Sequence, residues 1–541
     1  MLGIISWVKG IDNLGEGICN MRITSTIPHI VGLLSILTSL SYGSDIYIAQ
    51  NSAGTNSGAD CSNAHSVSWF NSNATGGNIY HLCGTFTGTA GSTMLTPPSG
   101  ASDNVLTILF ESGAVMSAPY WGGGTAGAIN IIGKGYIIID GGMNGVIKNT
   151  ANGTALAYHQ ASQGIYISNS NNIEIKNLTI QNIYANGGSN PNASDTNGIN
   201  TNNILLSGNN NNISINNNTL TASRTGVRVD FDRSKIDKID IHNNIISDHC
   251  WGIMIGAGSG GESATNVSIH GNEITDYLNW QCPANAAFCT NKTDAYHTDG
   301  IILYQPRGNA TIFSPKIYNN YIHGDLGAAS PTAYIYCTYG GGAGTTSTSC
   351  IIYNNLLVND GAHNTWLLST GENTSGHLIY NNTLIGRSSA GGTAMMLSGT
   401  NITVKNNIVV NVRVGIGSYK FIPDVLTASN NNVWYNINSG STDAIFSGND
   451  GGNWYSWSQW QALGFDANSS IFNPQLNASY QISSASSSAY RRGANLTGES
   501  IPFLDYDKSG IQRPVSGPWD AGVYQSSGKL PFPPSIISIG P

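Results

Sequence analysis

The chain has 541 residues, a net charge of −8 from 22 basic and 30 acidic side chains, and only 10 % charged residues. It contains no Lys/Arg-rich run, which argues against nucleic acid as a partner, and its few basic residues argue against a strongly polyanionic substrate. The length would suit three to four domains of about 150 residues each, unless the fold is a solenoid, in which a single core simply lengthens.

In chain order, the first expected element is a secretory signal within residues 1–44. Residues 21–44 open with Met21 and a basic residue, continue with an apolar run from Ile30 to Leu40, and end in small residues. This pattern is typical of a signal peptide and is too short to span a bilayer, and Met21 is then the expected start. The alternative is a buried N-terminal helix. We expect a secreted chain, extracellular or periplasmic, with no membrane span in its mature part.

Export predicts oxidised cysteines. The spacing suggests three disulfides and leaves Cys250 as a buried thiol; the expected pairs are Cys61–Cys83, Cys282–Cys289 and Cys337–Cys350. The chain has no C-x-x-C pair, so a zinc–cysteine site has no support.

A repeat of about 26 residues runs through the middle of the chain. Asparagine pairs inside apolar runs mark it, as in "KIYNNYI", "IIYNNLL" and "LIYNNTL"; the second member of each pair, or its equivalent, is Asn218, Asn244, Asn272, Asn320, Asn355, Asn382, Asn407 or Asn432. The gaps are 26, 28, 48, 35, 27, 25 and 25 residues. Each unit has three short strand-like runs and no helical pattern, which predicts an all-β fold, a parallel β-helix of about eleven coils stacked about 4.8 Å apart.

These asparagines are predicted to stack at one bend of successive coils, with their amides bonded along the axis, and to adopt the left-handed backbone that a sharp bend needs. Side chains alternate, so Val227 and Val229 should point into the core while Arg228 and Asp230 point out. Because open strand ends need covering, we expect an N-terminal cap over residues 45–104, the β-helix and its groove over residues 105–437, and a C-terminal cap, folded back on the coils, over residues 438–541.

The coils over about 100–440, with the closing segment "DKSGIQRPVSGPWDAGVY", resemble right-handed parallel β-helix proteins of the pectate lyase and polygalacturonase type. The resemblance implies that fold and a carbohydrate-active protein, without assigning the exact family, because the fold carries several chemistries. "HTDGI" at 297–301 echoes one part of the polygalacturonase motif set, but the paired aspartates and the Gly-His-Gly segment do not follow it.

Three insertions in the repeat indicate where the chemistry lies, since long loops in a compact repeat are usually functional. They cover residues 184–197, 276–298 and 337–350. All are expected to flank one strand column on the same side of the coils and to wall a groove suited to an extended polymer.

Two histidines are predicted one coil apart beside these insertions. The coils were aligned on their first inward residues, Ile199, Val227, Ile253 and Ile301. Four residues earlier lie Asp195, Ser223, His249 and His297, and two residues earlier lie Asn197, Thr225, Trp251 and Asp299; if Leu367 is the next inward residue, His363 joins the first column. An imidazole beside a carboxylate suits general acid/base catalysis, so His249, His297 and Asp299 are the first catalytic candidates. Asp294 and Asp299 are the candidate ligands for a divalent metal such as calcium, and the alternative is that the histidines only bond neighbouring coils.

The second catalytic cluster is "RVDFD", with Asp230 and Asp232 as a carboxylate pair and Arg228 as a substrate ligand. Two carboxylates suit glycoside cleavage, in which one protonates the leaving oxygen and the other acts as base or nucleophile. The alternative for Arg228 and Asp230 is an exposed ion pair of little energetic value.

Aromatic side chains are the third signal, because flat apolar faces stack on sugar rings. Together with Arg228 and His363, the predicted substrate-binding residues are Trp251, Tyr304, Tyr334, Tyr336 and Trp366.

The leading hypothesis is therefore a secreted glycoside hydrolase, expected to be a monomer, that cleaves a neutral or weakly charged polysaccharide and needs no cofactor. The first alternative is a polysaccharide lyase with a histidine base and a metal that neutralises a uronate. The second is a non-catalytic glycan-binding surface protein.

Overall fold

The computed structural model describes residues 43–153, 156–185, 200–257, 262–276, 298–304, 310–326, 333–339, 349–387, 391–437, 444–448 and 452–526. Every strand and helix described below belongs to the second of two compact units, Ser44–Pro541. Within the described residues, no helix has both the length and the apolarity needed to cross a membrane.

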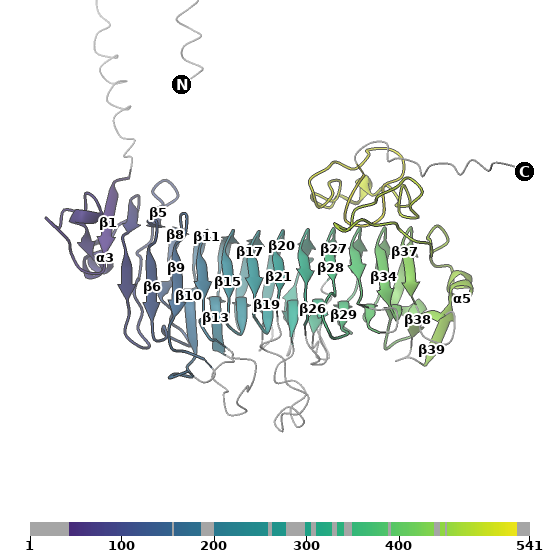
Figure 1. Ribbon diagram of the computed structural model, residues 1–541, viewed down its shortest axis with the longest axis horizontal. Helices are drawn as coiled ribbons and strands as arrows, with labels where there is room; N and C mark the ends of the chain where they lie inside the picture. Colours follow the sequence, from purple (N-terminus) through teal and green to yellow (C-terminus); the bar gives the residue numbers. More distant parts are fainter. Residues whose placement is uncertain are drawn as a thin grey trace, which may run out of the picture. The chain divides into compact units, whose positions relative to one another are not determined.

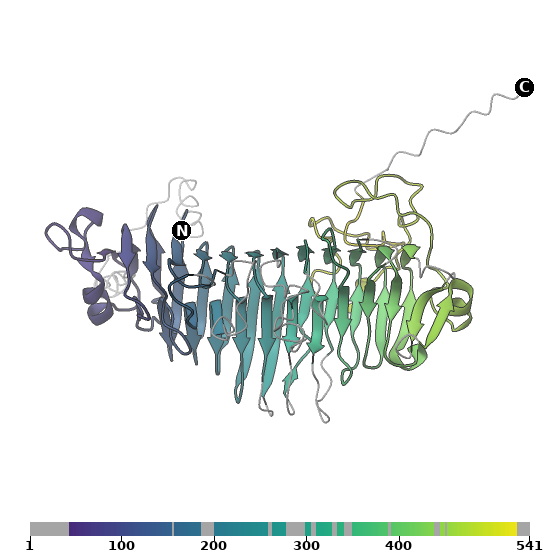
Figure 2. The same ribbon diagram turned by 60° about the horizontal axis from the view of Figure 1, so that its bottom comes forward.

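The described strands form three long sheets that run side by side along one axis (Figures 1 and 2). Sheet 1 has 15 strands, namely β1 (Asp45–Ala49), β2 (His65–Ser66), β3 (Ile79–Leu82), β5 (Leu106–Phe110), β8 (Gly135–Asp140), β11 (Asn171–Lys176), β14 (Asn211–Asn216), β17 (Lys235–His242), β20 (Ser263–His270), β23 (Thr311–Ile312), β24 (Lys316–Tyr318), β27 (Ile351–Tyr353), β30 (Leu378–Tyr380), β33 (Ile402–Lys405) and β36 (Leu426–Asn430). Sheet 2 has 12 strands, namely β4 (Thr85–Thr87), β6 (Val115–Ala118), β9 (Val146–Asn149), β12 (Thr179–Gln181), β15 (Thr219–Thr221), β18 (Ile245–Ser247), β21 (Glu273–Thr275), β25 (Tyr321–His323), β28 (Leu356–Val358), β31 (Thr383–Ile385), β34 (Ile408–Val412) and β37 (Val433–Ile437). Sheet 3 also has 12, namely β7 (Ile129–Ile132), β10 (Ser162–Ser168), β13 (Thr201–Ser207), β16 (Thr225–Asp230), β19 (Trp251–Gly256), β22 (Asp299–Tyr304), β26 (Ala333–Tyr339), β29 (Trp366–Thr370), β32 (Thr393–Met396), β35 (Val414–Gly417), β38 (Ala444–Gly448) and β39 (Asn453–Ser456).

The chain visits sheet 3, sheet 1 and sheet 2 in turn, and strands of successive coils pair in parallel, as β16 does with β19 and β19 with β22; only β39 of sheet 3, among the described strands, pairs antiparallel, with β38. The predicted right-handed parallel β-helix is thus confirmed. Sheet 1 begins at β1 and β3, inside the segment predicted to be a cap, so the first coils start before residue 105.

Alternation of side chains builds the core. Val227 and Val229 are fully buried, and Arg228 and Asp230 of the same strand point outward, as predicted. Successive coils place one apolar residue above another, so each sheet contributes continuous inward columns; in sheet 3 one column is Ile204, Val227, Ile253, Ile301, Ile335 and Leu368. Burial of such a column stabilises the whole length of the unit rather than one end.

The asparagine ladder, from Asn218 to Asn432, occupies the bend between sheets 1 and 2 as predicted. Each side-chain amide donates to the Oδ1 atom of the next ladder asparagine at 3.0–3.1 Å. The ladder ends where Asn432 donates to the buried carboxylate of Asp466 at 2.9 Å. Every ladder amide is buried and bonded, so this bend contributes stability on each coil.

One part of the ladder prediction was wrong. The left-handed backbone belongs to the residue before each ladder asparagine, such as Asn354 and Asn381, with φ of 54° and 53°. The two asparagines of a pair therefore have different roles. The first adopts the left-handed backbone that bends the chain, and the second forms the hydrogen bonds along the axis.

The C-terminal segment, residues 470–526, packs against sheets 1 and 2 beside β27 to β37 (Figure 1). The outward asparagines of the pairs bind it: Asn354 donates to the carbonyl of Tyr506 at 2.8 Å, and Asn406 to that of Ala494 at 2.9 Å. Arg513 is buried between this segment and the coils and donates to Asn354 Oδ1 at 3.0 Å.

Short helices accompany the ends of the sheets; they are α3 (Val67–Asn73), α4 (Ile422–Val425) and α5 (Trp457–Ala462). Trp460 of α5 is fully buried and stacks on Phe446 at 3.8 Å, which closes the apolar core at that end. The disulfide Cys61–Cys83 joins the region of α3 to the end of β3, as predicted, with Cα atoms 5.6 Å apart.

Candidate functional site

The outer face of sheet 3 carries most of the residues predicted to be functional. The register places Thr225, Trp251 and Asp299 opposite one another on β16, β19 and β22, as the sequence alignment predicted. The alignment failed one coil earlier: Ile204, not Ile199, faces Val227, because β13 begins only at Thr201. Asp195 and Asn197 lie outside the described residues.

A surface cavity of about 220 Å³, here called the sheet 3 cavity, lies over β16, β19 and β22. Its lining residues are Arg228, Asp230, Asp232, Met254, Gly256, Ala257 and Tyr304. The predicted "RVDFD" cluster and Tyr304 are therefore brought together. Gly256 is needed for this shape, because a Cβ there would lie 2.5 Å from the carbonyl oxygen of Tyr304.

Asp230 is held as the charged partner of Arg228. The guanidinium donates from Nη2 to Asp230 Oδ2 at 2.9 Å, and the other oxygen of Asp230 accepts the backbone N–H of Asp232 at 3.3 Å. The Arg228 and Asp230 side chains are 23 % and 31 % exposed, so the pair is partly shielded yet open to a ligand. The side chain of Asp232 is exposed at the following bend. One carboxylate is thus fixed by Arg228, and a second, exposed carboxylate lines the same cavity.

An aromatic strip continues from this cavity along the outer face of sheet 3. Four of the predicted aromatics belong to it, and they pack with Met254, Ile302 and Ala333; the four are Trp251, Tyr304, Tyr336 and Trp366. Trp251 and Tyr304 have ring centroids 6.4 Å apart, and Tyr336 and Trp366 have centroids 6.3 Å apart. The strip offers apolar ring faces over several coils next to the acidic cavity.

Tyr334 is not part of this strip, and its prediction as a substrate ligand was wrong. Its ring is fully buried in the core, and its hydroxyl donates to the carbonyl of Gly324 at 2.6 Å. The strand enters sheet 3 so that Tyr334 falls opposite the inward-facing Gly300, whereas Tyr336 faces outward.

His249 is also structural rather than catalytic. It is fully buried, and its Nε2 atom lies 2.6 Å from Asn203 Oδ1 on the neighbouring coils. Asn203 in turn donates to the carbonyls of Ile180 and Thr221, which fixes its oxygen toward the imidazole. Burial lowers the pKa of His249 to about 3, so the ring is neutral and Nε2 carries the proton. A neutral ring sealed from solvent cannot serve a polymeric substrate, so the catalytic prediction for His249 was wrong.

Asp299 shares this buried environment. It has no exposed surface and accepts the backbone N–H of Ala333 at 2.9 Å. The charges of Arg224 and Asp299 both act on the neighbouring thiol of Cys250, whose pKa burial raises to about 11. Asp299 is therefore sealed from solvent, and the predictions that it acts on substrate or binds a metal were wrong. His297, Asp294, Cys282 and Cys289 lie outside the described residues.

His363 lies at the surface, but not in the column predicted for it, because Leu368 rather than Leu367 faces Ile335. Its Nδ1 atom is 3.0 and 3.1 Å from the two carboxylate oxygens of Asp325. The Asp325 side chain is 6 % exposed and that of His363 is 37 % exposed. A buried carboxylate that orients an exposed imidazole is a general base arrangement. The sequence analysis missed Asp325, which is 38 residues from His363 and is found only by pairing the bends of neighbouring coils.

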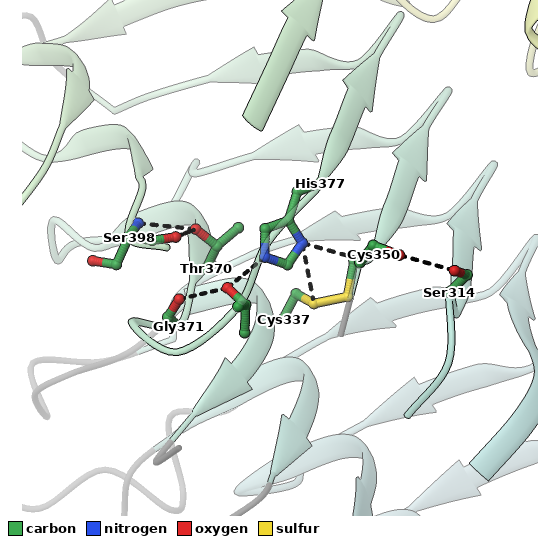
Figure 3. Close-up of a disulfide and its surroundings, with 9 residues drawn as sticks. Ser314, Cys337, Cys350, Thr370, Gly371, His377 and Ser398 are labelled. Carbon is green, nitrogen blue, oxygen red and sulfur yellow. Dashed lines mark hydrogen bonds between the residues drawn. A yellow bond between two sulfur atoms is a disulfide. The ribbon is translucent and has the colours of Figure 1, made fainter. Parts of the chain in front are cut away.

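The disulfide Cys337–Cys350 links the end of β26 to the start of the next sheet 1 strand, as predicted (Figure 3). His377 lies against it: its Nδ1 accepts the N–H of Cys350 at 3.0 Å, and its Nε2 lies 2.6 Å from the Thr374 hydroxyl. Burial lowers the pKa of His377 to about 3, so its ring is neutral. Cys337, Cys350 and His377 form the one group among the described residues with the spacing of metal ligands. Both cysteines, however, are bonded to each other in the disulfide.

Comparison with known proteins leaves the activity open. No family model matches the sequence, and no curated relative matches it. Among solved structures, pectate lyase Pel9A is 13 % identical, with 90 % of this chain and 98 % of that chain covered and a TM-score of 0.40. XylC in complex with xylose is 10 % identical, covering 90 % and 99 %, with a TM-score of 0.43. The PL6 family alginate lyase AlyGC is 12 % identical, covering 74 % and 55 %, with a TM-score of 0.38. At this level of similarity the chemistry has to be argued from the site itself.

Proposed function

We propose that this chain is a secreted glycoside hydrolase that cleaves an extended, neutral or weakly charged polysaccharide on the outer face of sheet 3. The observation that carries the proposal is the sheet 3 cavity, in which Asp230 and Asp232 meet beside an aromatic strip. Carboxylates at the end of an aromatic surface fit a polymer whose rings stack while one glycosidic bond lies over the acids.

The chemistry follows from the different surroundings of the two carboxylates. Arg228 donates to Asp230 and fixes the position of its carboxylate, which suits the base that activates water or the nucleophile that attacks the anomeric carbon. Asp232 is exposed and lines the same cavity beside Asp230, so it suits the acid that protonates the leaving glycosidic oxygen of a substrate bound there. The reaction consumes water, so we propose that the chain acts without a cofactor. We also propose that it acts as a monomer.

A second candidate function is supported by a different observation. The Asp325–His363 pair presents an imidazole whose Nδ1 atom is oriented by a buried carboxylate, which leaves Nε2 to accept a proton. A polysaccharide lyase needs a base to remove the proton next to a uronate carboxyl group, and His363 could supply it, with a divalent cation such as calcium neutralising that carboxylate.

One experiment separates these functions. The purified chain is incubated with a panel of polysaccharides, with and without chelator, and both new reducing ends and ultraviolet absorbance are measured. Hydrolysis gives reducing ends alone, whereas elimination adds an absorbing double bond. The D230N and D232N variants should abolish reducing-end release, while D103N, which changes an exposed carboxylate near the N-terminal coils, should retain it.

The lyase would be established instead if the unsubstituted chain released products that absorb in the ultraviolet, if H363N lost this activity and if D230N kept it. Binding of a glycan with no cleavage of any member of the panel would establish a non-catalytic surface protein.

A further inference from the structure

A second cavity, of about 670 Å³, lies at the bend between sheet 3 and sheet 1 and is not part of the proposed catalytic site. It runs across four neighbouring coils, and its walls are formed by residues 169–172, 209–212 and 235–238 with Ser263 and Thr265. We call it the asparagine trough. Its volume falls within the range of about 300–1,000 Å³ that is typical of ligand sites.

Two rows of left-handed residues border the trough. The first row is Asn169, Gly208 and Arg233, and the second is Asn172, Asn212, Lys238 and Asn266, whose φ values lie between 52° and 55°. Each such residue bends the chain, so every coil here turns twice within a few residues and the strip between the turns is concave. Asn212 donates to Asn172 at 2.6 Å, which ties the coils together along the second row. The trough is therefore built by the repeat and is not a gap left by a single loop.

The lining is polar and carries a net positive charge. Lys235 and Lys238 are exposed; within the described residues neither ammonium group makes a direct ion pair, and the charge of Lys238 acts at longer range on Asp237. Asp237 between them is already satisfied: Thr265 and Asn266 each donate to its Oδ1 atom at 2.6 Å, and these bonds lower its pKa. Two ammonium groups among asparagine amides in a chain of net charge −8 are suited to a ligand with many hydroxyl groups and a carboxylate.

The trough begins where the sheet 3 cavity ends. Asp232, in the turn after β16, lines the cavity, and Lys235, the first residue of β17, lines the trough. Three residues span at most about 10 Å of extended chain, so the two sites are within a few sugar units of each other. A polymer cleaved beside Asp232 would meet the trough directly as it passes over this turn.

We propose that the asparagine trough is a second glycan-binding site, which takes a uronate-bearing segment of the polysaccharide that is cleaved in the sheet 3 cavity. The choice of polymer rests on the proposed function, but binding in the trough does not require cleavage. The asparagine amides bond to sugar hydroxyls, and Lys235 and Lys238 face the uronate carboxylate. The trough thus selects, from weakly charged glycans, those that carry an acidic sugar a short distance from the scissile bond.

The test measures binding without turnover. Titration calorimetry measures the binding of an oligogalacturonide and of a neutral galactose oligosaccharide of the same length. Two proteins are compared, the D230N chain as parent and the D230N chain that also carries K235Q/K238Q. We expect the double substitution to weaken oligogalacturonide binding about 5- to 20-fold, because two charge-assisted contacts are lost, and to leave the neutral oligosaccharide unaffected. K148Q/K420Q removes the same two charges elsewhere and should bind both like the parent.

Unchanged oligogalacturonide affinity in K235Q/K238Q, or an equal loss in K148Q/K420Q, would overturn the proposal. Equal weakening of the neutral oligosaccharide would overturn the assignment of the acidic sugar. If D230N retains full cleavage while K235Q/K238Q loses binding, the catalytic proposal fails and the trough stands. If D230N is inactive and K235Q/K238Q binds normally, the catalytic proposal stands and the trough proposal fails.

Discussion

The bend between sheets 1 and 2 and the outer face of sheet 3 are built on the same coils but follow opposite rules. At the bend, one residue type repeats from Asn218 to Asn432, and each amide meets the next at 3.0–3.1 Å. On sheet 3, each coil carries different side chains at equivalent positions, such as Thr225, Trp251 and Asp299. The regular bend holds the coils in register, and this rigidity allows the irregular face to place charges and rings for a ligand.

The comparison is tested most strongly by removing a charge from the irregular face. D230N should lower cleavage of the polysaccharide by about 10²- to 10⁴-fold, the usual contribution of an acid/base group, with the melting temperature nearly unchanged. Initial rates of reducing-end release and a thermal melt measure the two effects. The matched control is R228Q, which removes the partner charge and should lower the rate less. A D230N protein that cleaves normally would leave sheet 3 with no demonstrated chemistry.

The opposite result is expected from the ladder. Asn355 donates to Ile317 O, Tyr353 O and Asn382 Oδ1 and accepts from the Asn320 amide, all in the core. N355A should lower the free energy of unfolding by about 2–4 kcal/mol, because several buried groups lose partners, while the rate per folded molecule stays the same. Chemical denaturation reports the loss. The control is N243G, at an exposed left-handed position of the same bend, which should cost only a few tenths of a kcal/mol.

Acid should act on the buried histidines and not on the ladder amides, which do not titrate. The pKa values of His249 and His377 are lowered to about 3 in the folded chain, against an ordinary value of 6.5. Between these two values the unfolded chain binds more protons, so stability is full above pH 6.5 and falls as the pH drops toward 3. Each histidine should contribute a slope of about 1.4 kcal/mol per pH unit in that window.

Melting temperatures from pH 7 to 4.5 measure this slope. H377N should flatten it by about one proton. An identical acid slope in H377N and the unsubstituted chain would show that His377 does not contribute to the acid limit.

The contrast between the two regions also explains what the sequence could predict. The ladder was predictable because its signal is local and repeated. An asparagine pair in an apolar run indicates where the chain bends, and the repeat indicates which asparagines lie next to it on adjacent coils. The strand register of β16, β19 and β22 followed for the same reason. The choice of catalytic residues was harder, because burial of His249 and Asp299 depends on side chains from adjacent coils, such as Asn203 and Ala333.

Insertions caused the remaining errors. They have no fixed length, so the repeat alone does not set the phase of the next coil: the phase of Ile301 was right after residues 276–298, but Ile199 was aligned where Ile204 belongs after residues 184–197. A one-residue slip at Leu367 likewise displaced His363 and concealed its pairing with Asp325. In each case the repeat period predicted that a strand is present. Its register depends on contacts between coils, which the sequence does not show.

The smallest expected effect concerns the aromatic strip, and it decides whether the irregular face binds a polymer at all. Trp366 is half-buried, 6.3 Å from Tyr336 and 6.5 Å from Tyr419 by ring centroids, and is separated along sheet 3 from the acidic cavity. W366A should raise KM for the polysaccharide about 5- to 10-fold, through loss of about 1 kcal/mol of ring stacking, and leave kcat and the cleavage of short oligosaccharides unchanged. W69A removes an equally half-buried tryptophan that stacks on His65 near the N-terminal end, and its KM should equal that of the parent. A fall in kcat with an unchanged KM would instead mean that Trp366 supports the coil beneath the site, since a ring that only holds substrate acts before the bond breaks and not during it.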